Sequence, residues 1–228
     1  MKIKVRVLWP DSEFKYKESV YSSNKFEKWI SNLGSNFNVD HIKIIKVHMF
    51  GDQVGFIHLE VFASDKEGNP VPGNAFIRGD SVSILTILTS SDTHEKFVIF
   101  TNQARIPVGM NVLESPAGMI DEGDPSIKAI EELKEEVGAN IDFSASKLSK
   151  LTSGYTSPGG IDERIDIYSY EVTLSSSEIN NLQGLVTGSS SESEFIKLEI
   201  IPFNEALSRT ESLVTKLALY EYEKKESK

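Results

Sequence analysis

The spacing of apolar residues predicts a helix and two strands in the N-terminal third of the chain. Four apolar residues have the i, i+3, i+4, i+7 spacing of an amphipathic helix: Phe26, Trp29, Ile30 and Leu33. Gly34 is the predicted end of this helix. Residues 42–47 and 54–62 are rich in β-branched and aromatic side chains, and they predict strands. A dense cluster of turn-forming residues at 65–74 predicts the end of this mostly antiparallel N-terminal unit.

From residue 78 onward, strands and helices follow one another without a regular alternation. Strands are predicted at residues 82–88, 96–101, 110–114, 165–172 and 195–201, the first two as a hairpin. Helices are predicted at residues 126–137, 176–182 and 213–223, with a frayed tail at 224–228. Irregular mixing of this kind indicates an α+β fold, with a β-rich domain at 1–77 and a second domain at 78–228.

The overall charge and composition narrow the class of protein. The formal net charge of −10 disfavours nucleic-acid binding, which depends on Lys and Arg neutralising phosphates. The absence of cysteine excludes disulfides and thiolate metal sites. The first residues lack the apolar segment of a signal peptide, and no run approaches the roughly 18 apolar residues of a membrane span. We expect a cytoplasmic protein with neither nucleic-acid nor membrane partners.

The predicted helix at 126–137 separates carboxylates from apolar side chains. At about 100° per residue, one arc holds Glu131, Glu132, Glu135 and Glu136. The opposite arc holds Ile127, Ile130, Leu133 and Val137. The acidic arc has two interpretations, because glutamates on a helix usually face water, whereas clustered carboxylates also suit Mg²⁺.

The residues around this helix resemble the Nudix box, a loop–helix–loop whose helix glutamates bind catalytic divalent cations. The resemblance is carried by Pro116-Ala117-Gly118 with Gly123-Asp124, followed by Glu131-Glu132-Leu133-Lys134-Glu135-Glu136-Val137-Gly138. It implies a site for Mg²⁺, or for Mn²⁺ in its place. The implied metal ligands are the backbone carbonyl of Ala117 and the side chains of Glu132, Glu135 and Glu136, the last also catalytic. Gly118 takes the place of the first glycine of the box and is an implied substrate-binding residue.

Two departures from the family pattern affect this site. The spacing from Gly118 to Glu131 is one residue shorter than in the pattern. The usual Arg, which in the family pairs with a metal-binding glutamate and orients it, is replaced by Glu131. The loss of this Arg affects the alignment of the metal-binding glutamate that it would orient.

The resemblance extends over most of the chain. Fragments similar to the plant-type ADP-sugar pyrophosphatases of the Nudix superfamily occur in order at residues 26–29, 65–79, 102–107, 114–119, 157–163, 182–184 and 194–197. This implies a Nudix α/β/α sandwich with a mixed sheet, preceded by a smaller β unit. It also implies a homodimer formed through the N-terminal domain.

Further site residues follow from the same resemblance. Arg105 would bind the diphosphate through its guanidinium group, or else form a surface ion pair. The turn with Ser157, Gly159 and Gly160 would bring backbone close to substrate, or be a tight turn only. Glu163 would face the site or lie in solvent. Glu194 is the implied general base, with Glu192 as its neighbour, and both could instead be exposed charges.

The predicted activity is hydrolysis of the diphosphate bond of an ADP-sugar, either ADP-ribose or ADP-glucose. The products would be AMP and a sugar 1-phosphate, so the predicted partner is a small nucleotide sugar. Two alternatives stay open: a UDP-sugar pyrophosphatase, and a non-catalytic Nudix-fold protein that binds a nucleotide sugar.

Overall fold

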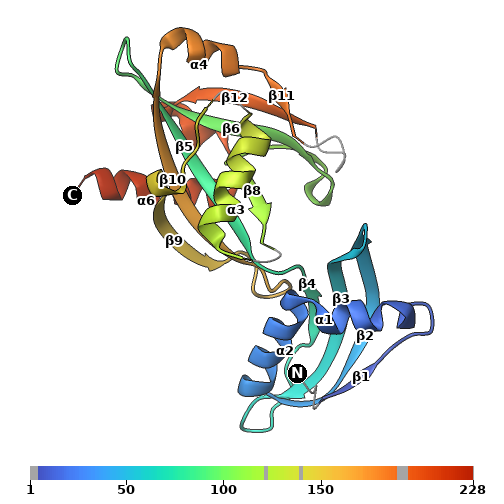
Figure 1. Ribbon diagram of the computed structural model, residues 1–228. Helices are drawn as coiled ribbons and strands as arrows, with labels where there is room; N and C mark the ends of the chain where they lie inside the picture. The colour runs from blue at the N-terminus through green and yellow to red at the C-terminus, as the bar shows by residue number, and fades with distance from the viewer. Residues whose placement is uncertain (1–4, 121–122, 139–140, 189–194, 228) are drawn as a thin grey trace. The chain divides into compact units, whose positions relative to one another are not determined.

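The computed structural model describes residues 5–120, 123–138, 141–188 and 195–227, in two compact units (Figure 1). The first unit comprises Met1–Asp80 together with Tyr155–Arg164, and the second comprises Ser81–Gly154 and Ile165–Lys228. The first unit therefore includes a segment that follows it by more than seventy residues in the sequence. Each unit is described by itself.

A four-stranded sheet forms the first unit, in the order β1-β2-β3-β4. The strands are β1 (Arg6–Leu8), β2 (Asn38–Phe50), β3 (Gln53–Ser64) and β4 (Asn74–Ile77). The β1–β2 pair is parallel and the other two pairs are antiparallel. The helical elements η1 (Phe14–Tyr16), α1 (Lys17–Ser22) and α2 (Asn24–Asn36) precede β2. Val20 and Phe26 from the helices share a buried core with Ile42 and Ile57 from the sheet.

The elements of the first unit are longer than the sequence predicted. The two predicted strands are the central parts of β2 and β3, which form one hairpin turning at Gly51, where φ is +58°. Helix α2 continues past Gly34 to Asn36, so the predicted end at Gly34 is wrong. Gly34 has open space around it, and a glycine inside a helix weakens it by only about 0.5–1 kcal/mol, less than packing provides.

A buried carboxylate joins the N-terminal segment to β2. Glu13 is 2% exposed, and its carboxylate accepts hydrogen bonds from the Lys46 ammonium at 2.9 Å and the Val47 N–H at 3.0 Å. Burial alone would raise the pKa of Glu13, but these hydrogen bonds outweigh it and lower the pKa below its ordinary value of 4.5.

We expect Glu13→Gln to lower the free energy of unfolding at neutral pH by about 1–3 kcal/mol, because hydrogen bonds to a charged acceptor are lost. Since the folded-state pKa is lowered, this stabilisation is complete above the unfolded-state pKa and disappears as the pH falls through the folded value. Urea unfolding at pH 7 and pH 3 measures it. The exposed Glu18→Gln is the matched control; an equal effect of both variants at pH 7 would contradict the assignment.

The second unit contains an eight-stranded mixed sheet. Six strands run in the order β11-β12-β6-β5-β10-β9, while β7 pairs with β6 and β8 pairs with β5. The strands are β5 (Ser81–Ser90), β6 (Lys96–Arg105), β7 (Met110–Glu114), β8 (Ala117–Met119), β9 (Ser149–Tyr155), β10 (Arg164–Leu174), β11 (Val186–Thr187) and β12 (Ile196–Pro202). The β10–β5 pair is parallel, whereas β5–β6 is the predicted antiparallel hairpin.

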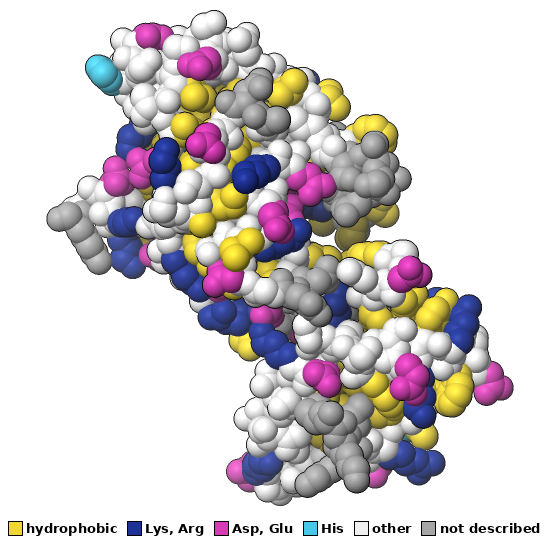
Figure 2. Space-filling model, in the orientation of Figure 1, with side chains coloured by type: hydrophobic (Ala, Val, Ile, Leu, Met, Phe, Trp, Pro, Cys, Tyr) yellow, Lys and Arg dark blue, Asp and Glu magenta, His cyan; other side chains and the backbone are white. Residues whose placement is uncertain are grey.

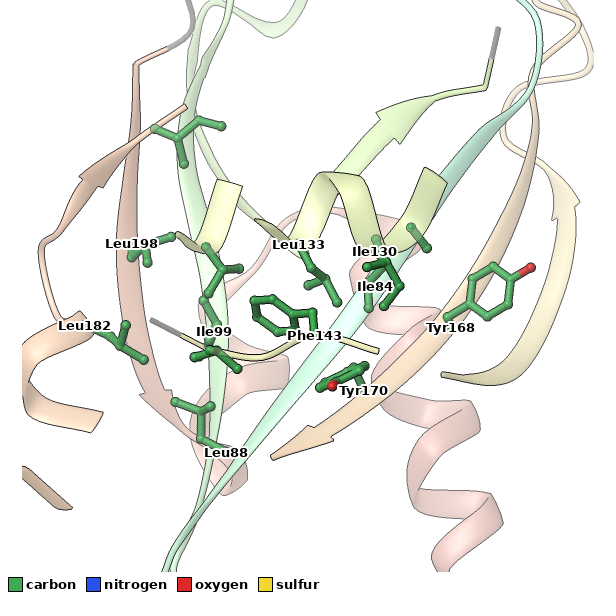
Figure 3. Close-up of a cluster of buried hydrophobic side chains, with 14 of the residues drawn as sticks. Ile84, Leu88, Ile99, Ile130, Leu133, Phe143, Tyr168, Tyr170, Leu182 and Leu198 are labelled. Atoms are coloured by element: carbon green, nitrogen blue, oxygen red, sulfur yellow. The ribbon is translucent and has the colours of Figure 1, made fainter. Parts of the chain in front are cut away.

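Helices cover both faces of this sheet. One core lies beneath α3 (Pro125–Glu132) and α4 (Ser176–Leu182), and the other beneath α5 (Phe203–Arg209) and α6 (Leu213–Glu226). In Figure 1 α3 lies in front of the sheet and α6 behind it. Figure 3 shows the first core, in which Ile130 and Leu133 point toward Ile84, Ile99 and Phe143. The predicted α/β/α sandwich with a mixed sheet is confirmed.

The central strand β5 shows why this arrangement forms. Ile84 and Leu88 belong to the first core, whereas Leu85 and Ile87 belong to the second. Because side chains alternate across a strand, a continuous apolar run supplies both cores at once.

The end of the chain differs from the prediction. Residues 224–228 were expected to fray, but α6 continues to Glu226, and the Lys225 ammonium donates a hydrogen bond to the Ser149 hydroxyl. Lys96 also contacts this last turn, through Tyr222 and Glu226. Among the helices that the structure describes, none is long and apolar enough to cross a membrane.

Candidate functional site

Helix α3 begins and ends at residues that the sequence marks. Asp124 is its N-cap and accepts the N–H of Ser126 at 2.7 Å, with Pro125 in the first turn. A π-helical turn, η3 (Leu133–Val137), follows the α-helical part, and Gly138 ends it with φ at +98°. Such turns insert one extra residue and often occur at functional sites.

The predicted apolar arc of this helix is largely confirmed. Ile130, Leu133 and Val137 are buried in the first core. Ile127, which was assigned to the same arc, is 58% exposed. At about 100° per residue Ile127 lies at the edge of the apolar arc, next to the exposed Glu131, so it faces solvent with that residue.

The four glutamates of the acidic arc do not share one environment. Glu132 is 8% exposed and Glu136 is 3% exposed, whereas Glu131 and Glu135 are exposed. On the face that carries α3, Figure 2 shows acidic side chains interspersed with Lys and Arg. The acidic arc thus divides into a solvated pair, Glu131 and Glu135, and a buried pair, Glu132 and Glu136, and metal binding by the buried pair stays a prediction.

Both buried carboxylates reach the backbone of strand β8. The Ala117 N–H donates to Glu136 Oε2 at 3.0 Å. A Cβ atom at Gly118 would lie 2.0 Å from both Cδ and Oε1 of Glu132, so only glycine leaves room for this carboxylate. The two carboxyl groups therefore contact consecutive residues of the same strand.

Lys128 provides the positive charge beside this pair. Its ammonium lies 2.7 Å from Glu132 Oε1 and 3.9 Å from Glu131 Oε2. Burial lowers the pKa of Lys128. The hydrogen bond and charge of Glu132 and the charges of Glu131 and Glu135 raise it by a larger amount, so the pKa lies above its ordinary value. Lys128 is therefore charged at neutral pH.

The donor set fits a hard divalent cation. Carboxylate oxygens are the ligands that Mg²⁺ prefers, and two buried carboxylates, Glu132 and Glu136, carry negative charge that a cation would offset. Within the described ranges, however, no group of three or more His, Asp or Glu side chains is arranged to hold a metal ion. The assignment of Glu132, Glu135, Glu136 and the Ala117 carbonyl as metal ligands stays a prediction.

Arg105 lies at the end of β6, paired with a neighbouring strand. Its Nε donates to Glu114 Oε2 at 2.7 Å, and its side chain is 40% exposed. The β6–β7 register pairs Arg105 with Met110 and Glu114 with Thr101, so the long arginine side chain reaches along the strand pair to this carboxylate. The ion-pair interpretation of Arg105 is confirmed, and its binding of a diphosphate stays a prediction.

The predicted substrate loop belongs to the first unit. Glu163 is 7% exposed, accepts the Thr156 hydroxyl at 2.8 Å and forms an ion pair with Arg78 at 3.3 Å, so it is not a solvated loop residue. The Gly160 N–H closes a turn onto the Ser157 carbonyl.

The glycines of this turn are not required by its conformation. Gly159 and Gly160 have open space at the Cβ position, and neither has a positive φ. The Gly160 carbonyl accepts the Phe76 N–H at 2.8 Å. The tight-turn interpretation therefore accounts for the contacts of this segment, and substrate binding by Ser157, Gly159, Gly160 and Glu163 stays a prediction.

The two candidate bases, Glu192 and Glu194, lie outside the described residues. Described residues on both sides of them are placed near the buried pair. The Thr187 hydroxyl donates to the Glu136 carbonyl, and Thr187 pairs with Ile196. The hairpin formed by β11 and β12 is thus joined to the end of the glutamate helix.

Comparison with known proteins decides the family. No protein-family model matches the chain. Nudix hydrolase 14, chloroplastic, of Arabidopsis thaliana is 34% identical over 226 residues, which cover 90% of this chain and 72% of the relative. The chain belongs to the Nudix hydrolases.

Other relatives of this Nudix hydrolase carry more specific names. An ADP-ribose pyrophosphatase of Bacillus subtilis is 33% identical, over 53% of this chain and 59% of the relative. A GDP-mannose pyrophosphatase of Pectobacterium atrosepticum is 28% identical, over 73% of this chain and 83% of the relative. A crystal structure of an ADP compounds hydrolase shares the fold, with a TM-score of 0.57 at 15% identity over 84% of this chain and 95% of that one.

The partners in two ion pairs of this Nudix hydrolase were not identified from its sequence. The i,i+4 spacing of Lys128 and Glu132 permitted their ion pair, but the same lysine could equally have faced solvent. Arg105 and Glu114 are not opposite each other in the β6–β7 register, so strand pairing alone would not have identified this ion pair.

Proposed function

We propose that this Nudix hydrolase cleaves the diphosphate linkage of nucleotide sugars in a reaction that depends on a divalent cation. One observation carries the proposal: Glu132 and Glu136 are buried together against the backbone of Ala117 and Gly118. Burying two carboxylates against one strand is costly unless positive charge accompanies them. A bound cation would offset that cost and would attract the phosphates of a substrate.

ADP-sugars, with ADP-ribose and ADP-glucose first, are the proposed substrates. The ADP-ribose pyrophosphatase of Bacillus subtilis supports this choice, whereas the GDP-mannose pyrophosphatase of Pectobacterium atrosepticum supports a nucleotide sugar with a different base. The shared chemistry is a diphosphate between a nucleoside and a sugar. Within this class of substrates, we propose a preference for adenine over other bases.

The reaction is the addition of one water to one phosphorus–oxygen–phosphorus bridge. The water oxygen bonds to one phosphorus while the bridging oxygen leaves with the other, which gives AMP and a sugar 1-phosphate from an ADP-sugar. Bound Mg²⁺, or Mn²⁺ in its place, would lower the pKa of water and offset the phosphate charge.

The protein's own groups have three proposed roles in this reaction. Glu132, Glu135 and Glu136, with the Ala117 carbonyl, would hold the cation. Arg105, fixed by Glu114 through Nε, would direct its guanidinium group at the diphosphate. Glu194, or its neighbour Glu192, would accept the proton that the water loses.

A substrate panel tests the proposal directly. Purified protein is incubated with Mg²⁺ and ADP-ribose, ADP-glucose, UDP-glucose or GDP-mannose, and the released nucleotide is identified by chromatography. We expect AMP from the ADP-sugars to form fastest, and EDTA to stop its release. Faster release of UMP or GMP would transfer the assignment to another base, and no release from any member would overturn it.

Replacement of Arg105 by alanine is expected to raise the KM for the diphosphate substrate by about 10-fold or more, because a charge-assisted hydrogen bond contributes roughly 1.5–3 kcal/mol. Steady-state kinetics at saturating Mg²⁺ measure it. The matched control is Arg209→Ala, which removes a half-exposed arginine from α5. An unchanged KM in Arg105→Ala would leave Arg105 as a structural ion-pair residue only.

The proposal includes the expected cytoplasmic location and a homodimer formed through the N-terminal unit. Both rest on the sequence resemblance and stay predictions. Light scattering of the purified protein would give its mass in solution, and a monomeric mass would contradict the dimer.

A further inference from the structure

We infer that Lys128 is a positioning residue for Glu132. Its ammonium group, one helical turn earlier in the chain, provides the positive side-chain charge that this chain lacks at position 131. The inference rests on the proposed function, because it assigns Glu132 to the divalent-cation site. It concerns the protein's own ion pair and not the identity of the substrate. Nothing else in the sequence pattern assigns a role to Lys128.

The negative charge of Glu131 means that a positively charged side chain from another position must pair with Glu132. Glu131 stands where the family pattern has Arg, so the residue before Glu132 adds negative charge to the helix instead of relieving it. Like charges four residues apart on a helix repel, and Glu131–Glu135 and Glu132–Glu136 are two such pairs. The buried carboxylate of Glu132 therefore requires a positive partner from elsewhere.

The geometry selects Lys128 for this role. Its ammonium contacts Glu132 Oε1 at 2.7 Å, compared with 3.9 Å to the exposed Glu131. The lysine side chain is 28% exposed, so it is held along the protein surface and not extended into water. Lys134, the other lysine of this helix, is exposed.

The backbone of β8 also limits the position of Glu132. The Cβ position of Gly118 lies within 2.5 Å of both carboxylate oxygens of Glu132, so the group is confined between β8 and the lysine. With Lys128 removed, the carboxylate loses its 2.7 Å ion pair, which is one of the contacts that hold it in this confined place. Groups that only orient a metal ligand commonly change metal affinity or activity by about 10–100-fold when they are replaced.

The test is a direct measurement of Mn²⁺ binding by electron paramagnetic resonance, in parallel with turnover. Lys128→Met removes the charge and keeps most of the apolar stem. We expect it to weaken Mn²⁺ binding by about 10-fold or more and to raise the metal concentration for half-maximal rate equally. The KM for substrate at saturating metal should change little.

Two further variants test whether the positive charge of Lys128 is responsible for the effect on Mn²⁺ binding. Lys128→Arg should bind Mn²⁺ nearly as the unaltered protein does. Glu131→Arg combined with Lys128→Met should recover much of the lost affinity, because it returns a cation to position 131. Lys134→Met is the matched control, and circular dichroism in EDTA verifies that each variant is folded.

The outcomes separate this inference from the proposed function. If Lys128→Met binds Mn²⁺ as tightly as the unaltered protein, or more tightly, the positioning role is wrong even when AMP is released normally. If Mn²⁺ binding depends on Lys128 but no nucleotide sugar is cleaved, the inference holds and the substrate proposal fails. An unaltered protein without saturable Mn²⁺ binding would overturn both.

Discussion

Replacing Glu136 by glutamine is expected to lower turnover by more than roughly 100-fold, because even groups that only support a metal ligand contribute about 10–100-fold. Glu136 is 3% exposed and lies at the backbone of β8, where it accepts the N–H of Ala117. Glutamine has nearly the same shape, and its carbonyl oxygen can accept the same hydrogen bond. The substitution therefore removes the negative charge and leaves the packing in place.

Single-turnover kinetics with ADP-ribose and Mg²⁺ measure this loss, and thermal unfolding measures the fold. The matched control is Glu131→Gln, an exposed residue of the same helix, which should retain turnover within a few-fold. Turnover of Glu136→Gln equal to that of the control would remove Glu136 from the cation site.

Gly118→Ala is expected to displace the Glu132 carboxylate and to reduce turnover by more than about 10-fold. The added Cβ atom would lie 2.0 Å from Cδ and Oε1 of Glu132, closer than any non-bonded contact allows. Either the strand or the buried glutamate must move, and overpacking of this kind typically costs about 1–3 kcal/mol of stability. A lower melting temperature should therefore accompany the loss of rate.

A second variant keeps this prediction testable where the single substitution prevents folding. Glu132→Asp withdraws the carboxylate by one methylene, so Gly118→Ala with Glu132→Asp should recover thermal stability without recovering rate. Gly154→Ala is the matched control, because its Cβ position has nothing within 4 Å. Full activity and stability of Gly118→Ala would show that the contact between Gly118 and Glu132 is dispensable.

The helix of the site could be predicted closely because its signals are local. Asp124 and Pro125 mark its start, Gly138 marks its end, and the apolar spacing identifies its buried face. The environment of each glutamate could not be predicted in the same way. A uniform 100° per residue does not allow for the π-helical turn after Glu132, and it does not show which carboxylates the neighbouring strand covers.

The short elements were missed for a related reason. Strands β8 and β11 contain too few residues to show a hydrophobic period, and β9 and α5 were not recognised from theirs. All four are paired with or packed against longer neighbours. Strand β8 is the one with functional consequences. Its three residues pair with β5 and present the backbone that both buried glutamates contact.

The sequence by itself determined the elements with a clear period, the α+β class and the resemblance to a family, because all three depend on the order of residue types. It could not determine which distant groups meet. The tertiary structure alone brought β8 beneath the glutamate helix, joined Arg105 to Glu114 and placed residues 155–164 with the first unit. Such contacts depend on strand pairing and burial, where the environment of a charge is decided by residues far away in the chain.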